Sequence, residues 1–167
     1  MHDELTKQDI QKMKEELEHR RKELLPEQLE EVKRTRAFGD LSENYEYKTA
    51  KQELNRNKSR IRYLEQMIKT AHVISDRSSA DTVGLYDRVT VYMEEDDEEQ
   101  VIQVVTTVRT DPRQGLISKE SPFGKAVLGA REGDRVTVTV SNDYSYVCEI
   151  RHIEKGADDG SAPILQY

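Results

Sequence analysis

Cysteine is almost absent from this chain: Cys148 is the only one, so no disulfide can form within it. Long hydrophobic runs are also missing, and none approaches the roughly 20 apolar residues of a membrane-spanning helix. The N-terminus is polar and charged and lacks the pattern of a signal peptide. We therefore expect a cytoplasmic protein with no membrane contact, in which Cys148 is a small core or strand residue rather than a nucleophile.

Basic residues are outnumbered, with 26 Lys and Arg against 33 Asp and Glu and a net charge of −7. Because broad binding to duplex DNA needs clustered Lys and Arg, we expect no strong independent binding to DNA. Hydrophobic and charged residues each make up 35% of the chain. That balance is lean for one globular core, but it suits a small domain joined to an exposed helical hairpin.

Residues 1–74 have the pattern of an antiparallel coiled-coil hairpin. Apolar residues recur at alternating spacings of three and four on both sides of a short link at 38–44, and so short a link makes the two helices fold back on each other. Each arm should be about 45 Å long at 1.5 Å per residue. Pro26 predicts a kink or restart in the first arm. The predicted seam residues are Ile10, Met13, Leu17, Leu24, Tyr47, Ala50, Leu54, Asn57, Ile61, Leu64, Ile68 and Ala71.

Helix caps can be predicted at both ends of the hairpin. Thr6, with Asp9 three residues later, is a candidate N-cap for the first helix. Within the link, Asp40 and Glu43 have the spacing of a capping box, and Ser42 is an alternative cap that would leave both acids free. Asn57 would be a polar seam residue that fixes the register of the arms.

The second half changes to a period of two, which predicts strands. We expect a linker at 75–84 and, at 85–155, a small antiparallel β-sheet domain with one short helix, which makes the whole chain α+β. The acidic run 94–99 should be a solvated hairpin turn. Ser121 and Pro122 predict the start of the short helix. Residues 156–167 are expected to be a disordered tail.

Two distant motifs carry a family resemblance. Gly39-Asp40-Leu41-Ser42-Glu43-Asn44, with Glu46-Tyr47, resembles the tip signature of the bacterial Gre transcript-cleavage factors, GreA/GreB. The second motif combines 116–118, 121–122, 126–129 and 133–134, and is similar to the LIS, SP, A..LG and GD run in the second domain of that family. The resemblance spans about residues 5–154.

The resemblance implies an FKBP-like C-terminal domain and a partner, bacterial RNA polymerase. The coiled coil of such factors enters the secondary channel of the polymerase, which then hydrolyses the 3′ end of a backtracked nascent RNA. It implies that the protein is no enzyme itself and acts as a monomer. It also gives Asp40 and Glu43 their role: tip acids that act in the polymerase active centre and hold a Mg²⁺ shared with the polymerase, in the complex only.

The resemblance assigns two further sets of residues. Cations beside the tip would contact the RNA, although they also fit ordinary solvated helix charges paired with glutamates. Residues before and within the LIS…SP motif would lie on the polymerase-docking side, although turn and capping chemistry explains them equally well. The RNA-contact candidates are Lys33, Arg34, Arg36, Lys48 and Lys51, and the docking candidates are Asp111, Pro112, Ser121 and Pro122.

Three functions compete. The first is a cleavage-stimulating elongation factor, and the second is a Gre-like inhibitor that occupies the same channel without promoting cleavage. The third is a coiled-coil adaptor whose tip is only a capped turn. Tyr45 departs from the alanine common in the family and adds bulk beside the tip; with Phe38 it would pack at the tip or on a displaced base.

Overall fold

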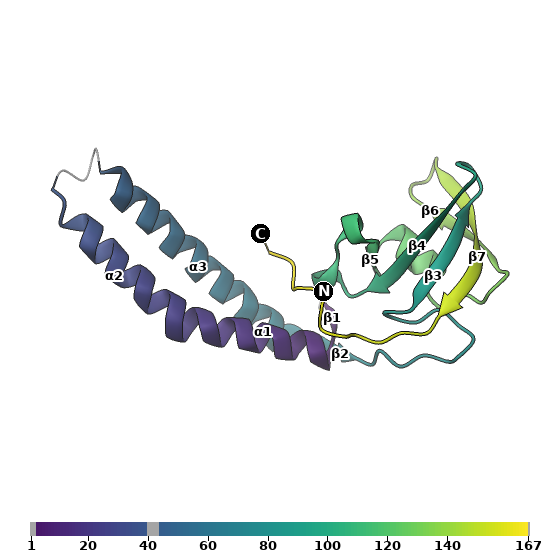
Figure 1. Ribbon diagram of the computed structural model, residues 1–167, viewed down its shortest axis with the longest axis horizontal. Helices are drawn as coiled ribbons and strands as arrows, with labels where there is room; N and C mark the ends of the chain where they lie inside the picture. The colour runs from purple at the N-terminus through teal and green to yellow at the C-terminus, as the bar shows by residue number, and fades with distance from the viewer. Residues whose placement is uncertain (1–2, 40–43, 167) are drawn as a thin grey trace. The chain divides into compact units, whose positions relative to one another are not determined.

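The computed structural model describes residues 3–39 and 44–166 (Figure 1). The chain divides into two compact units. The hairpin unit is Ile10–Ala71, and the sheet unit combines Asp3–Asp9 with the described part of His72–Tyr167. The N-terminal segment therefore belongs to the same unit as the C-terminal half of the chain, although α1 continues from it into the hairpin unit.

Two helical arms form the hairpin unit (Figure 1). The first arm is continuous through α1 (Lys7–His19), a π-helical segment η1 (Arg20–Leu24) and α2 (Leu25–Arg36), and the second arm is α3 (Tyr45–Thr70). Both α2 and η1 contact α3, and the two arms run antiparallel (Figure 1). The heptad prediction holds on α3, where the seam buries Ala50, Leu54, Asn57, Ile61 and Leu64.

Near Pro26, where a kink or restart was predicted, the first arm stays helical and changes from η1 to α2, which begins at Leu25 with Pro26 in its first turn. The irregular segment precedes it as η1, beside the polar part of the seam. There Asn57, 2% exposed, accepts a hydrogen bond from Arg20 Nη1 at 3.0 Å. Arg60 bonds Glu16 at 2.9 Å in the same region. The expected single polar seam residue is therefore one member of a larger polar cluster between the arms.

The N-terminal segment carries a cap that the sequence predicted. Thr6 N donates to Asp9 Oδ2 at 3.0 Å, and Asp9 N donates to Thr6 Oγ1 at 3.2 Å, which is a reciprocal capping box. The strand before it was not predicted. β1 (Glu4–Thr6) pairs in parallel with β2 (His72–Ile74) in a two-stranded sheet.

A five-stranded sheet, in the order β5-β4-β3-β7-β6, forms the rest of the sheet unit. All neighbouring pairs are antiparallel except β4 and β5, which run parallel, so the expected wholly antiparallel sheet is mixed. A crossover through two short 3₁₀ turns, η2 (Thr107–Arg109) and η3 (Pro112–Gln114), lets β5 join β4 in that direction. The strands are β3 (Arg88–Met93), β4 (Glu98–Val105), β5 (Leu116–Ser118), β6 (Arg135–Thr139) and β7 (Ser145–Glu154).

The alternation of the strands places one face of the sheet in the core. Val89 and Val91 of β3 are fully buried, as are Cys148 and Ile150 of β7. The helix α4 (Pro122–Val127) packs against β6. Cys148 is thus a core residue, as predicted, and burial raises the pKa of its thiol.

The turn formed by the acidic run 94–99 is shorter than expected, because the last two residues of the run already belong to β4. Some of its carboxylates are paired at the surface, where Glu94 accepts two bonds from Arg135 (2.7 and 2.8 Å). Glu99 accepts one from Arg151 at 2.6 Å. Within the described residues no group of three or more His, Cys, Asp or Glu is arranged to hold a metal.

The tail was expected to be disordered, and over residues 156–166 the structure differs. Ala162 and Ile164 are buried, and Leu165 N donates to Val108 O at 2.7 Å. The side chain of Asp158 is 1% exposed and forms an ion pair with Arg109. Small polar composition suggested disorder, but these few apolar and charged side chains find partners in the sheet unit. No helix in the described ranges is long and apolar enough to span a membrane.

Candidate functional site at the hairpin turn

The first arm ends in a backbone turn that favours glycine. α2 ends at Arg36, and Phe38 N donates to Thr35 O at 3.2 Å. Gly39 follows with φ +105°, a conformation that side chains with a Cβ rarely adopt. The Gly39 of the tip motif is therefore explained by the backbone.

Asn44 starts the second arm and joins it to the first. Its Oδ1 accepts from Tyr47 N at 3.0 Å, which caps α3, and its Nδ2 donates to Thr35 O at 2.7 Å. Thr35 is itself fully buried and donates through Oγ1 to Glu31 O at 2.8 Å. One amide side chain thus serves both as a helix cap and as a clasp between the arms.

This cap corrects two predictions. Neither Asp40 nor Ser42 is the N-cap of α3, because that position belongs to Asn44. The sequence held the correct signal, because Asn caps helices as well as Asp or Ser does.

Asp40 and Glu43 themselves lie outside the described residues. The chain positions on either side of them are known: Gly39 ends the first arm and Asn44 is clasped to that arm through Thr35. The acids therefore occur in the segment that closes the hairpin, and α3 requires neither of them as its cap.

The five RNA-contact candidates are exposed and lie on the last turns of α2 and the first turns of α3. Arg34 bonds Glu31 at 2.9 and 2.6 Å, and this pairing raises the pKa of Arg34 and lowers that of Glu31. For Arg34 the pairing with a glutamate is thus observed. The side chains of Lys33 and Arg36 are exposed at the end of α2.

Aromatic rings accompany the cations on both arms. Arg34 lies over the ring of Phe38 at 5.2 Å, and Lys48 over that of Tyr45 at 5.4 Å. Each of the two rings therefore has a cation from its own arm above it. Packing at the tip would instead place the rings of Phe38 and Tyr45 against each other. Phe38 remains 55% and Tyr45 78% exposed. Exposed rings beside cations suit contact with bases and phosphates of single-stranded nucleic acid.

Two of the four docking candidates, Asp111 and Ser121, act as caps on either side of β5. Asp111 accepts from Arg113 N at 3.1 Å and caps η3, whose first residue is Pro112. Ser121 accepts from Gly124 N at 3.0 Å and caps α4, which begins at Pro122. The predicted capping chemistry is confirmed for both, and a docking role remains a prediction.

Comparisons with known proteins cover both units. Residues 4–73 match the family model "Transcription elongation factor, N-terminal", and residues 78–155 match "Transcription elongation factor, GreA/GreB, C-term". The transcription elongation factor GreA of Geobacillus kaustophilus (strain HTA426) is 42% identical over 135 residues, which are 80% of this chain and 85% of that protein. GreA of Thermoanaerobacter pseudethanolicus (strain ATCC 33223 / 39E) is 43% identical over 137 residues, 81% of this chain and 87% of that protein.

A solved structure is similar over most of the chain. The match to the crystal structure of GreA factor homolog 1 (Gfh1) protein of Thermus thermophilus spans 93% of this chain and 100% of the Gfh1 chain, at 25% identity and a TM-score of 0.43. The two family models together account for nearly all residues from 4 to 155, in the order expected from the two motifs. The chain therefore belongs to the GreA/GreB family of transcription elongation factors.

Proposed function

We propose that this protein binds bacterial RNA polymerase, places its hairpin in the secondary channel and stimulates hydrolysis of the 3′ end of backtracked nascent RNA. The observation that carries the proposal is the match to both family models in the expected order. The first of them covers the helical hairpin, and the tip signature lies in the segment that joins its two arms. On this account the polymerase performs the reaction, and the protein supplies groups that complete its active centre.

The donor chemistry at the turn fits a magnesium ion. Mg²⁺ prefers hard oxygen ligands and keeps several waters, and carboxylates such as those of Asp40 and Glu43 are ligands of that type. These two residues would hold the ion jointly with the polymerase, and the bound ion would stabilise developing charge and lower the pKa of a water. Two carboxylates do not complete an octahedral shell, which is why we expect no ribonuclease activity from the protein alone.

The flanking residues support contact with RNA. Lys33 and Arg36 are exposed cations near the end of α2. Lys48 and Lys51 are exposed cations near the start of α3. Cations at these places would neutralise phosphates of an extruded 3′ end. The exposed ring of Tyr45 would offer a surface on which a base stacks.

Stalled polymerase complexes with labelled RNA test the proposal. Asp40→Asn with Glu43→Gln should abolish RNA shortening while affinity for polymerase stays nearly unchanged, because docking is assigned to the sheet unit. The matched control is Glu30→Gln with Glu53→Gln, which removes the same charge from exposed positions on the arms. Normal shortening by the tip variant would refute the assigned role of the acids.

The bulk of Tyr45 favours a second candidate, an inhibitor of the polymerase. A ring that is 78% exposed beside the closing segment would obstruct a narrow channel. The same assay separates the candidates: a cleavage factor shortens the RNA, an inhibitor slows synthesis without shortening it, and a plain adaptor does neither.

A further inference from the structure

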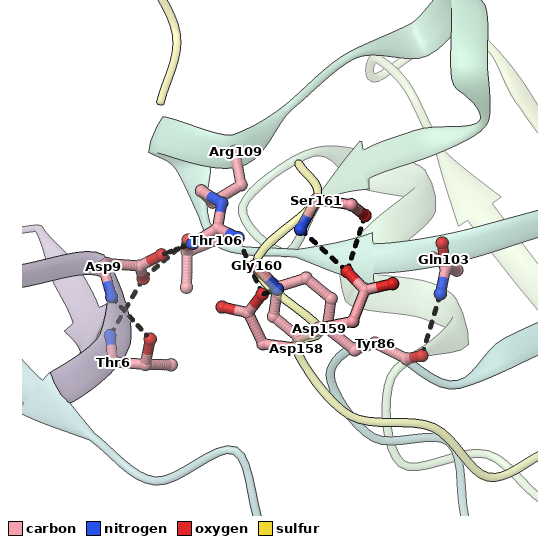
Figure 2. A network of polar contacts seen from close by, with 10 residues as sticks. All are labelled: Thr6, Asp9, Tyr86, Gln103, Thr106, Arg109, Asp158, Asp159, Gly160 and Ser161. Carbon is pink, nitrogen blue, oxygen red and sulfur yellow. Dashed lines mark hydrogen bonds and ion pairs between the residues drawn. The ribbon is translucent and has the colours of Figure 1, made fainter. Parts of the chain in front are cut away.

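A buried arginine in the sheet unit binds two carboxylates that come from opposite ends of the chain (Figure 2). Arg109 Nη1 donates to Asp9 Oδ1 at 3.0 Å, and Arg109 Nη2 donates to Asp158 Oδ1 at 2.7 Å. The exposed fractions of the three side chains are 0% for Arg109, 0% for Asp9 and 1% for Asp158. Arg109 therefore links the start of α1 to the tail.

The guanidinium depends on these two acids. Its Nε has no hydrogen-bond partner among the described residues, so Asp9 and Asp158 supply its charged hydrogen bonds. The guanidinium carbon of Arg109 lies 5.7 Å from the centre of the Tyr86 ring. Burial raises the pKa of the Tyr86 phenol well above its ordinary value. A buried charge that loses one of its partners is strongly destabilised. Removal of the charge on either Asp9 or Asp158 is therefore expected to weaken the hydrogen bond between Arg109 and the other carboxylate.

Asp9 uses its carboxylate for the helix as well. Its Oδ2 accepts from Thr6 N, the capping bond of α1, and from Thr106 Oγ1 at 2.8 Å. The neighbouring Gln8 reaches the tail directly: with its amide oriented to donate, Nε2 lies 3.2 Å from Asp158 Oδ2. The first turn of α1 is thus fastened to both η2 and the tail.

The tail is held along its length. Asp158 Oδ1 also accepts from Gly160 N at 2.9 Å, which shapes the backbone around the buried carboxylate. Beyond it, Ala162 and Ile164 are buried, and Leu165 N bonds Val108 O next to Arg109. The match to the family's C-terminal model ends at residue 155, so this segment lies beyond it.

We propose that residues 156–166 form a strap that locks the first turn of α1 onto the sheet unit through Asp158 and Arg109. The strap supplies the second carboxylate that Arg109 needs, and Arg109 in turn holds Asp9, the residue that closes the capping box. All of these contacts lie within the sheet unit, whose N-terminal segment ends at Asp9. This role does not depend on the proposed function.

Amide hydrogen exchange on the full-length protein, read residue by residue by NMR, tests the strap. The reporters are the amides of Thr6 and Asp9, which form the capping box. Asp158→Asn keeps the shape and removes the charge. The matched control, Asp159→Asn, removes the same charge one residue later, at an exposed side chain that bonds only Ser161 within the tail. A chain ending at Lys155 removes the whole strap.

We expect exchange at Thr6 and Asp9 to rise roughly tenfold or more in Asp158→Asn and in the shortened chain. Val89 and Val91, in the central strand, should keep their protection in Asp158→Asn, and Asp159→Asn should match the wild type. Equal exchange in Asp158→Asn and Asp159→Asn would overturn the proposal. So would a shortened chain with Thr6 and Asp9 still protected, or a loss of protection in Asp158→Asn that is as large at Val89 and Val91.

Discussion

Asn44 offers a sharp test of how the hairpin turn is built, because its two hydrogen bonds can be removed one at a time. Asn44→Ala removes both the cap on Tyr47 N and the clasp to Thr35 O. Loss of an Asn cap costs about 1 kcal/mol. Loss of a hydrogen bond to a carbonyl costs about another 1 kcal/mol. We therefore expect Asn44→Ala to lower the free energy of unfolding of the hairpin unit by about 2 kcal/mol.

Asn44→Asp separates the two contributions. The aspartate keeps an oxygen that caps α3, but it has no amide hydrogens to donate to Thr35 O. The expected loss is about 1 kcal/mol, which is half of that in Asn44→Ala. Urea unfolding followed by far-UV circular dichroism measures both, because the helices of the hairpin unit dominate that signal.

Asn55→Ala is the matched control, since Asn55 is exposed in the interior of α3. Alanine is the better helix former there, so the same substitution should stabilise by about 0.5 kcal/mol. Equal losses in Asn44→Asp and Asn44→Ala would refute the clasp. A loss in Asn44→Ala below about 0.5 kcal/mol would refute the cap as well.

Three further outcomes are expected. Burial raises the pKa of the Cys148 thiol, so an aromatic disulfide reagent at pH 8 should react with it only after denaturant is added, and fast reaction with the native protein would contradict its place in the core. The hydrogen bond from Lys119 lowers the pKa of Glu4 below 4.5, so the stability difference between wild type and Glu4→Gln should be full above pH 4.5 and shrink as pH falls through the lowered pKa; a difference independent of pH would exclude the pair. Ser121→Ala should destabilise the sheet unit by about 1 kcal/mol while Ser121→Asp retains the cap on Gly124 N, and thermal unfolding that ranks the two variants equally would argue against capping.

Local chemistry was predictable from the sequence. Thr6 and Asp9, three residues apart, predicted the start of α1. Ser121 and Pro122 predicted the start of α4 in the same way. The alternation around Val89 and Cys148 gave strands and core. Each of these features depends on neighbours close in the chain, so a pattern in one stretch of sequence suffices to predict it.

Features that depend on distant partners were not predictable in this way. The partners in the pair Arg109 and Asp158 are 49 residues apart, and Asp9 is 100 residues from Arg109. Nothing in the polar composition of the tail indicates that one of its acids faces a buried arginine. The parallel pairing of β1 with β2 and of β4 with β5 likewise depends on where the chain returns, which hydrophobic alternation does not encode.

The cap on α3 bears directly on the tip acids. Spacing alone favoured a purely structural explanation, in which Asp40 caps the second helix and Glu43 completes a capping box. That explanation required the helix to begin beside Asp40, whereas α3 begins at Tyr45 and takes its cap from Asn44. Capping of α3 therefore does not account for the two carboxylates. The proposed role of the two acids in the polymerase active centre therefore stays a prediction, and the RNA-shortening assay on Asp40→Asn with Glu43→Gln tests it in a chain of the GreA/GreB family.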